Sequence, residues 1–282
     1  MKPQQQGAQL DVLARPTERK TNPFFGIVSF IQKTLVIAEL EARKLRHDPT
    51  ELLTRAVQPA LWLLVFGEVF ARLRVIPTGN ISYIDFLAPG ILAQSVLFIA
   101  IFGGISLIWE RDLGIVHKFL VSPTPRGALS LGKALSGGAR ALSQAVIVYV
   151  LAVILGVKVN WNPVALVGVL AAVILTAAAF SAFSFCIALV VKTRERFMGI
   201  GQVLTMPFFF ASSAIYPISI MPTWLKVVAH ANPLTYAVDA LRALMLANGT
   251  STWGLGVDFS VLFGATVVLV TVAAWLYPRA AT

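Results

Sequence analysis

The segment at residues 126–135, RGALSLGKAL, has the spacing of a phosphate-binding loop. Gly127 is followed after four residues by Gly132 and Lys133, the frame in which backbone N–H groups and a lysine hold nucleotide phosphates. A Ser or Thr that binds magnesium normally comes next, but this chain has Ala134. A working loop also follows a buried strand, which the two prolines of the preceding VSPTPR exclude. We therefore interpret the match as accidental.

Other residues that carry out chemistry are few. The single cysteine, Cys186, permits neither a disulfide framework nor a cysteine metal site. The histidines, His47, His117 and His230, are far apart in sequence. No apolar segment combines the His, Asp, Ser or Glu residues that an intramembrane enzyme needs. We expect no metal, no cofactor bound by this chain and no catalytic residues.

The composition is typical of a membrane protein. Of the 282 residues, 57% are hydrophobic and only 13% are charged, against roughly 25% charged residues in soluble domains. The net charge of +10 would suggest nucleic acid as a partner of a soluble protein. Here we expect a lipid bilayer and no nucleic acid.

Six apolar segments are long enough to cross a bilayer core about 30 Å thick as helices. They lack the two-residue alternation of barrel strands, so the predicted fold class is an all-α integral membrane protein with a six-span domain over residues 55–277. The fifth segment is irregular, because Pro207 and Pro217 interrupt it. The predicted spans are 55–71, 86–109, 129–157, 163–191, 198–220 and 259–277.

The distribution of basic residues predicts the orientation. If the N-terminus is cytoplasmic, seventeen of the 23 Lys and Arg residues fall on the cytoplasmic side and five on the opposite side. We therefore expect a multi-pass protein of the plasma or inner membrane with both termini in the cytoplasm.

The region before the first span divides into two parts. Residues 1–28 form a polar cytoplasmic tail, and 29–50 are predicted to form an amphipathic helix, whose apolar stripe includes Ile31, Leu35 and Ala38. A basic amphipathic helix at this place is typical of the membrane interface. The alternative is a helix that packs on the protein's own loops.

Two segments between spans have unusual patterns. In the cytoplasmic segment 110–125, Ile115, Val116, Phe119 and Leu120 predict a short amphipathic helix that lies on the membrane or docks into a soluble partner. An ordinary turn between two spans is the alternative.

The other segment, 212–250, is apolar but contains several prolines, and we expect two short re-entrant helices in the outer leaflet. Asn232 is predicted to cap the second of them and Pro233 to open it. Asp239 and Arg242, three residues apart on that helix, can pair.

Some polar and aromatic residues within the spans are candidates for a transport pathway. Charged and polar side chains are costly in a membrane and therefore indicate function, and aromatic side chains suit an apolar substrate. The candidates are Gln94, Arg140, Gln202, Phe208 and Phe209. The alternatives are a structural pairing for Arg140 and lipid contact for the phenylalanines. Small residues at 103–104, 137–138 and 177–179 are expected to permit close helix contacts.

With these elements in order, the chain resembles the permeases of type-2 ABC exporters, the family of the daunorubicin-resistance and nodulation-factor permeases. The most specific parts are ERDLGIVHKFLVSPTPR after the second span and ANPLTYAVDALR before the last one. The resemblance extends over about residues 38–277.

This resemblance implies a complex of two permease chains, as a homodimer or a heterodimer, with two soluble ATP-binding subunits that hold ATP and Mg²⁺. The segment after span two would be a coupling helix that docks into the ATPase, and its residues are Glu110, Arg111, Asp112, Gly114, His117, Lys118, Phe119, Ser122 and Pro123. The re-entrant region would line an outer gate through Pro217, Asn232, Pro233, Tyr236, Asp239 and Arg242.

The function expected from the resemblance is export, or efflux. The apolar and aromatic residues of the fifth segment favour an amphiphilic or hydrophobic small molecule, drug or lipid-type substrate. The main alternative is a secondary transporter or channel without an ATPase partner. That class predicts an inverted repeat and charged, broken helices near the midplane, of which we find only the broken fifth segment.

Overall fold

The computed structural model describes residues 57–73, 76–78, 81–113, 126–191 and 193–276. These residues are helical or in connecting segments, apart from an isolated β-bridge between Val159 and Leu246. The predicted tail, the amphipathic helix 29–50 and most of the segment 110–125 lie outside the described residues. The elements are η1 (Trp62–Gly67), α4 (Glu68–Leu73), α5 (Tyr83–Gly103), α6 (Ile105–Asp112), α8 (Arg126–Ile154), α9 (Pro163–Val190), α10 (Arg194–Phe210), η2 (Ile218–Ile220), α11 (Thr223–Ala231), α12 (Pro233–Met245) and α13 (Leu255–Leu276).

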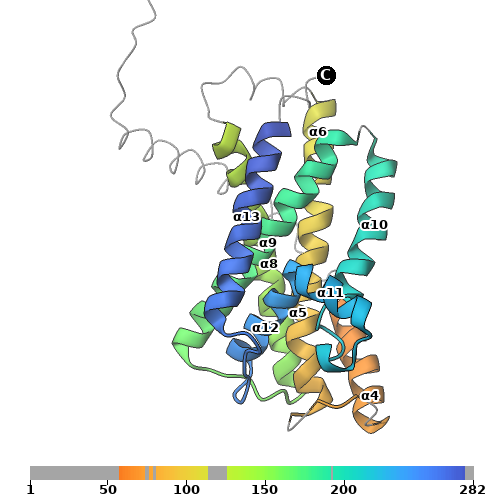
Figure 1. Cartoon of the computed structure of the whole chain (residues 1–282), viewed down its shortest axis with the longest axis vertical. Coiled ribbons are helices and arrows are strands. Elements are labelled where there is room, and N and C mark those ends of the chain that lie inside the picture. Colours follow the sequence, from red (N-terminus) through yellow and green to blue (C-terminus); the bar gives the residue numbers. More distant parts are fainter. Residues whose placement is uncertain (1–56, 74–75, 79–80, 114–125, 192, 277–282) are drawn as a thin grey trace, which may run out of the picture.

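Helix α9 is the centre of the bundle and contacts α5, α8, α12 and α13 (Figure 1). Helix α6, the end of α13 and the start of α10 lie at one end of the bundle, which we call the α6 end. Helices α4, α11 and α12 lie at the opposite end, which we call the α12 end. Apart from α6, which continues α5 within the stretch Tyr83–Asp112, the short helices α4, α11 and α12 are therefore gathered at one end of the bundle.

Three helical stretches are long and apolar enough to cross a membrane. They are Tyr83–Asp112, Pro163–Val190 and Leu255–Leu276, and they correspond to the predicted second, fourth and sixth spans. The described residues of α8 also include a shorter apolar stretch, Arg140–Ile154. The membrane-protein class is supported, whereas the count of six spans stays a prediction.

Helix α10 does not coincide with the predicted fifth span, 198–220. Helix α10 begins earlier, at Arg194, because the Thr193 side chain accepts a hydrogen bond from the backbone N–H of Arg196 at 3.4 Å and caps the helix. It continues through Pro207 and ends at Phe210. A proline inside a helix removes one backbone donor, and α10 accommodates this loss without ending there.

Asparagine or serine caps, some followed by proline, fix the starts of three helices. The side chain of Ser82 accepts from the N–H of Asp85 at 3.1 Å at the start of α5. Asn162 precedes Pro163 in α9, and Asn232 precedes Pro233 in α12, each accepting the N–H two residues on. The cap and the opening proline predicted for α12 are confirmed.

Glycines bring two helices close to α9, as the sequence predicts. Gly104, between α5 and α6, lies directly against the Ser184 hydroxyl, which hydrogen-bonds to the carbonyl of Ile101. Gly137 of α8 lies against the hydroxyl of Ser181. A methyl group at either glycine would overlap these oxygens, so the close approach depends on the missing side chain.

Candidate functional site

Asn232 joins three elements at the α12 end. Its carboxamide oxygen accepts from the N–H of Leu234 at 3.0 Å, and its amino group donates to the carbonyl of Phe208 at 2.7 Å and to that of Ala211 at 3.4 Å. The side chain is 4% exposed. One buried amide therefore caps α12 and also binds carbonyl groups that the end of α10 leaves free.

Arg242 holds the segment 211–217 against α5. Its Nη2 donates to the carbonyl of Ser213 at 2.7 Å, and its guanidinium carbon lies 3.9 Å from the centroid of the Phe86 ring. Burial lowers the pKa of Arg242 to about 10, although the negative charge of Asp239 opposes the shift. The guanidinium stays charged at neutral pH, stabilised by the carbonyl and the ring.

The segment 211–217 packs closely on α5. The carbonyl of Ala214 lies directly against Gly90, where a Cβ atom would clash with it, and the hydroxyl of Tyr83 donates to the carbonyl of Ile215 at 3.2 Å. Pro217 then begins the short helix η2. The region predicted to be re-entrant is thus an ordered structure of two short helices, α11 and α12, and a packed segment.

Asp239 and Arg242 do not bind each other as their spacing predicts. Asp239 instead accepts from the N–H and the hydroxyl of Thr252, at 2.7 and 2.9 Å, from the Ser251 hydroxyl at 2.9 Å and from the N–H of Trp253 at 3.3 Å. The two side chains leave α12 toward different segments, because each finds closer partners outside the helix.

Tyr236 belongs to an aromatic group beside this connection. Its ring lies 5.0 Å from that of Trp253, and its hydroxyl donates to the carbonyl of His230 at 2.8 Å. The His230 ring lies 5.6 Å from Trp253. These contacts attach the α12–α13 connection to α11 and α12.

Three of the predicted coupling residues lie in the last turn of α6. Glu110 is buried, whereas Arg111 donates to the carbonyl of Val191 at 3.3 and 3.4 Å. Asp112 accepts from Arg194 at 2.7 and 3.2 Å. This turn is therefore bound to the connection between α9 and α10. The remaining residues of the predicted set, Gly114, His117, Lys118, Phe119, Ser122 and Pro123, lie outside the described residues.

The predicted pathway residues lie on three helices and in different surroundings. Gln94 is buried in α5, while Gln202 is exposed on α10. In α8, the Arg140 guanidinium lies beside Gly103, with 3.7 Å between Nη1 and the position of a Cβ atom there. Phe208 packs edge-on against the rings of Phe180 and Phe183, and the buried Phe209 packs against Trp62. The structure does not gather these five residues into one site.

The comparisons with known proteins agree on one family. The profile of the ABC-2 type transporter matches residues 32–246, about three quarters of the chain. The ycf38 protein of Cyanophora paradoxa, whose name describes a transport permease, is 28% identical over 218 residues, which cover 76% of this chain and 74% of that protein.

The daunorubicin resistance ABC transporter permease protein DrrB1 of Streptomyces coeruleorubidus is 25% identical over 82% of this chain and 81% of its own. Nodulation protein J of Rhizobium leguminosarum is 25% identical over 70% and 74%. The chain belongs to the ABC-2 type transporter family.

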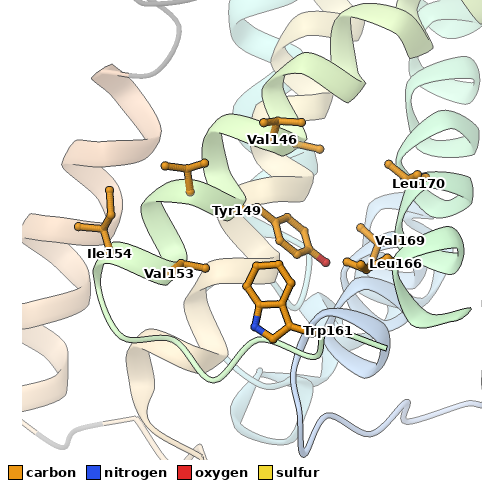
Figure 2. Close-up of a pocket in the computed structure, with 10 residues that line it drawn as sticks. Val146, Tyr149, Val153, Ile154, Trp161, Leu166, Val169 and Leu170 are labelled. Carbon is orange, nitrogen blue, oxygen red and sulfur yellow. The ribbon is translucent and has the colours of Figure 1, made fainter. Parts of the chain in front are cut away.

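This ABC-2 permease also has an apolar groove between α8 and α9, of about 470 Å³ (Figure 2). Tyr149 projects into it beside Trp161, and in the described part of the chain the buried Tyr149 hydroxyl has no hydrogen-bond partner. The other lining residues are Ala145, Val146, Val150, Val153, Ile154, Leu166, Val169 and Leu170. Several of them are exposed, so the groove opens on the side of the bundle.

The sequence reasoning missed several residues of the permease. Asp258 immediately precedes the predicted sixth span, 259–277, but it lies in the first turn of α13 and is fully buried. An ionisable residue within a span is a functional candidate by default, so a span starting four residues earlier would have included it. Gly90 and the lining of the groove gave no local signal, because both depend on segments distant in sequence.

Proposed function

We propose that the chain is the membrane-spanning permease subunit of an ATP-driven exporter for an amphiphilic or hydrophobic small molecule, drug or lipid-type substrate. The observation that carries the proposal is the family match over residues 32–246, together with relatives named for drug resistance. The apolar groove between α8 and α9 is consistent with a substrate of this class.

ATP and Mg²⁺ would be bound by a separate soluble subunit. Residues 127–133, which have the spacing of a phosphate-binding loop, lie at the start of α8 and not in a loop, and from residue 130 onward helical hydrogen bonds occupy their backbone N–H groups. The segment 110–125 would dock into that subunit. The contacts of Arg111 and Asp112 with Val191 and Arg194 support this role, since they tie the start of the segment to two further helices.

Two permease chains with six spans each would form the pathway, with the α6 end in the cytoplasm and the α12 end outside. The predicted gate residues at the α12 end include Asn232 and Arg242, which bind backbone carbonyls of 208–213. A displacement of α12 would therefore move the segment that packs on α5. In this proposal that movement opens the outer gate.

The decisive experiment replaces residues 114–119 by a flexible Gly/Ser segment of equal length in the tagged chain. We expect the variant to insert normally but to lose its co-purifying ATP-binding subunit and the ATPase stimulation by daunorubicin. Gly199→Ala is the matched control, because Gly199 is exposed and no other group lies within 4 Å of its Cβ position. An unaltered complex with unaltered stimulation in the replacement variant would contradict the coupling role.

A further inference from the structure

One hydroxyl group lies between two buried carboxylates at the α12 end. The Ser251 hydroxyl, in the connection between α12 and α13, is 2.9 Å from Asp239 Oδ2 and 2.9 Å from Asp258 Oδ2. Its oxygen also accepts the N–H of Gly254 at 2.7 Å. Asp239 and Asp258 are 1% and 0% exposed, so neither carboxylate is solvated by bulk water.

The number of hydrogen atoms available constrains this arrangement. A serine hydroxyl donates one hydrogen bond and accepts two. If both carboxylates were ionised, the single hydrogen would serve one of them, and the other would place an anionic oxygen 2.9 Å from an oxygen lone pair. A proton on one carboxyl group removes the conflict, because Ser251 then donates to one carboxylate and accepts from the other carboxyl group and from Gly254.

The surroundings of the two groups decide which of them carries the proton. Asp239 receives three other hydrogen bonds, two from Thr252 and one from the N–H of Trp253, and Arg242 lies nearby on the same helix. Asp258 has Ser251 as its partner, and its buried Oδ1 has no hydrogen-bond partner among the described residues. A fully buried carboxylate with an unpaired oxygen is strongly disfavoured in the charged form.

Among the side chains that the structure describes on the packed elements, no other charged group compensates Asp258. Helix α9 carries no Asp, Glu, Lys, Arg or His, and the described charged side chain of α8, Arg140, lies beside Gly103 of α5. Arg242 donates to the carbonyl of Ser213, and the His230 ring packs on Trp253.

We propose that Asp258 holds a proton and with it donates a hydrogen bond to Ser251, which in turn donates a hydrogen bond to ionised Asp239, so that this relay latches α13 to α12. The proton comes from water through the half-buried Ser251 and needs no other reactant. When it leaves at higher pH, two buried anions face one hydroxyl and the contact between α12 and α13 weakens. The latch is thus closed at low pH and open at high pH, and it does not depend on the transported substrate.

Infrared spectroscopy of the purified full chain in lipid nanodiscs tests the protonation state directly. We expect the wild-type protein at about pH 5 to show the C=O stretch of a protonated, buried carboxylic acid. This band should be absent in Asp258→Asn and present in Asp85→Asn, a control that removes another buried aspartate at the same end of the bundle. A wild-type spectrum without the band, or a band that Asp258→Asn leaves unchanged, would overturn the proposal.

A stability measurement tests the latch. From about pH 5 to about pH 8, the melting temperature of the wild-type protein should fall as Asp258 loses its proton, whereas that of Asp258→Asn should stay level, since the amide still donates to Ser251. Asp258→Ala and Ser251→Ala should melt several degrees lower at the acidic end. Equal pH dependence of the wild-type protein and Asp258→Asn would show that the relay does not titrate, even if the alanine variants fail to fold.

Discussion

At the residue scale, the α12 end depends on single polar side chains that bind backbone groups of other segments. Asn232 and Arg242 donate to carbonyls between residues 208 and 213, and Asp239 accepts from backbone and side-chain groups of 251–253. Leaving a buried backbone group unpaired costs about 1–3 kcal/mol. Each of these side chains therefore contributes more to the stability of the fold than its charge or its place on a helix indicates.

Asn232→Ala should destabilise the permease more than the same change in an equivalent cap. The substitution loses the cap, worth about 1 kcal/mol, and leaves the buried carbonyl of Phe208 unpaired, at about 1–3 kcal/mol more. Asn162→Ala is the control, because Asn162 also precedes a proline and accepts an N–H, at 2.9 Å, but is exposed. The measurement is the free energy of unfolding in mixed micelles; equal losses in the two variants would show that the carbonyl contact contributes nothing.

At the element scale, close contact with α9 depends on glycines at defined faces. Gly137 and Gly138 are adjacent on α8, but a Cβ atom at Gly137 would overlap the Ser181 hydroxyl, whereas one at Gly138 would lie 3.5 Å from Ile174. The same residue type therefore has a strict steric role at one position and ordinary packing at the next.

Substituting each of these two glycines by alanine should give opposite results. Gly137→Ala forces α8 away from α9 and should cost about 1–3 kcal/mol, as overpacking does. Gly138→Ala should be neutral or should stabilise α8 by up to about 1 kcal/mol through helix propensity. Combining Gly137→Ala with Ser181→Ala should recover part of the loss; no recovery in unfolding measurements would mean that another contact is responsible.

Some helix bounds can be predicted from the sequence, whereas others depend on contacts between distant segments. Hydropathy predicts α9 within one residue at each end, and the Asn-Pro pair predicts the start of α12, because both signals are local. The sequence does not predict the end of α10, because the helix continues through Pro207. It also does not predict the partners of Asp239 and Arg242, because Thr252 and Ser213 lie in connections whose path depends on tertiary contacts.

At the scale of the whole molecule, the two ends of the bundle differ in the kind of side chain that holds their elements together. At the α6 end, charged residues join α6 to the α9–α10 connection, whereas the α12 end has buried polar groups beneath short helices. The excess of basic residues in the segments assigned to the cytoplasm predicts that the α6 end faces the cytoplasm.

Thiol labelling should establish this orientation. After Cys186→Ser, a membrane-impermeant maleimide should label a cysteine introduced at Thr250 in intact cells, because Thr250 is exposed at the α12 end. A cysteine at Thr124 should be labelled only after the membrane is permeabilised. The reverse pattern would invert the topology and place the segment 110–125 outside the cell.

The last turn of α6 has a mechanical consequence. Besides the hydrogen bonds from Arg111 to Val191, the Arg194 guanidinium pairs with Asp112 and stacks 3.6 Å from the centroid of the Trp109 ring. The corner formed by α6 and the start of α10 therefore has few independent degrees of freedom. We therefore expect a push on residue 112 to reach the start of α10 through these contacts, although the push itself never touches that helix.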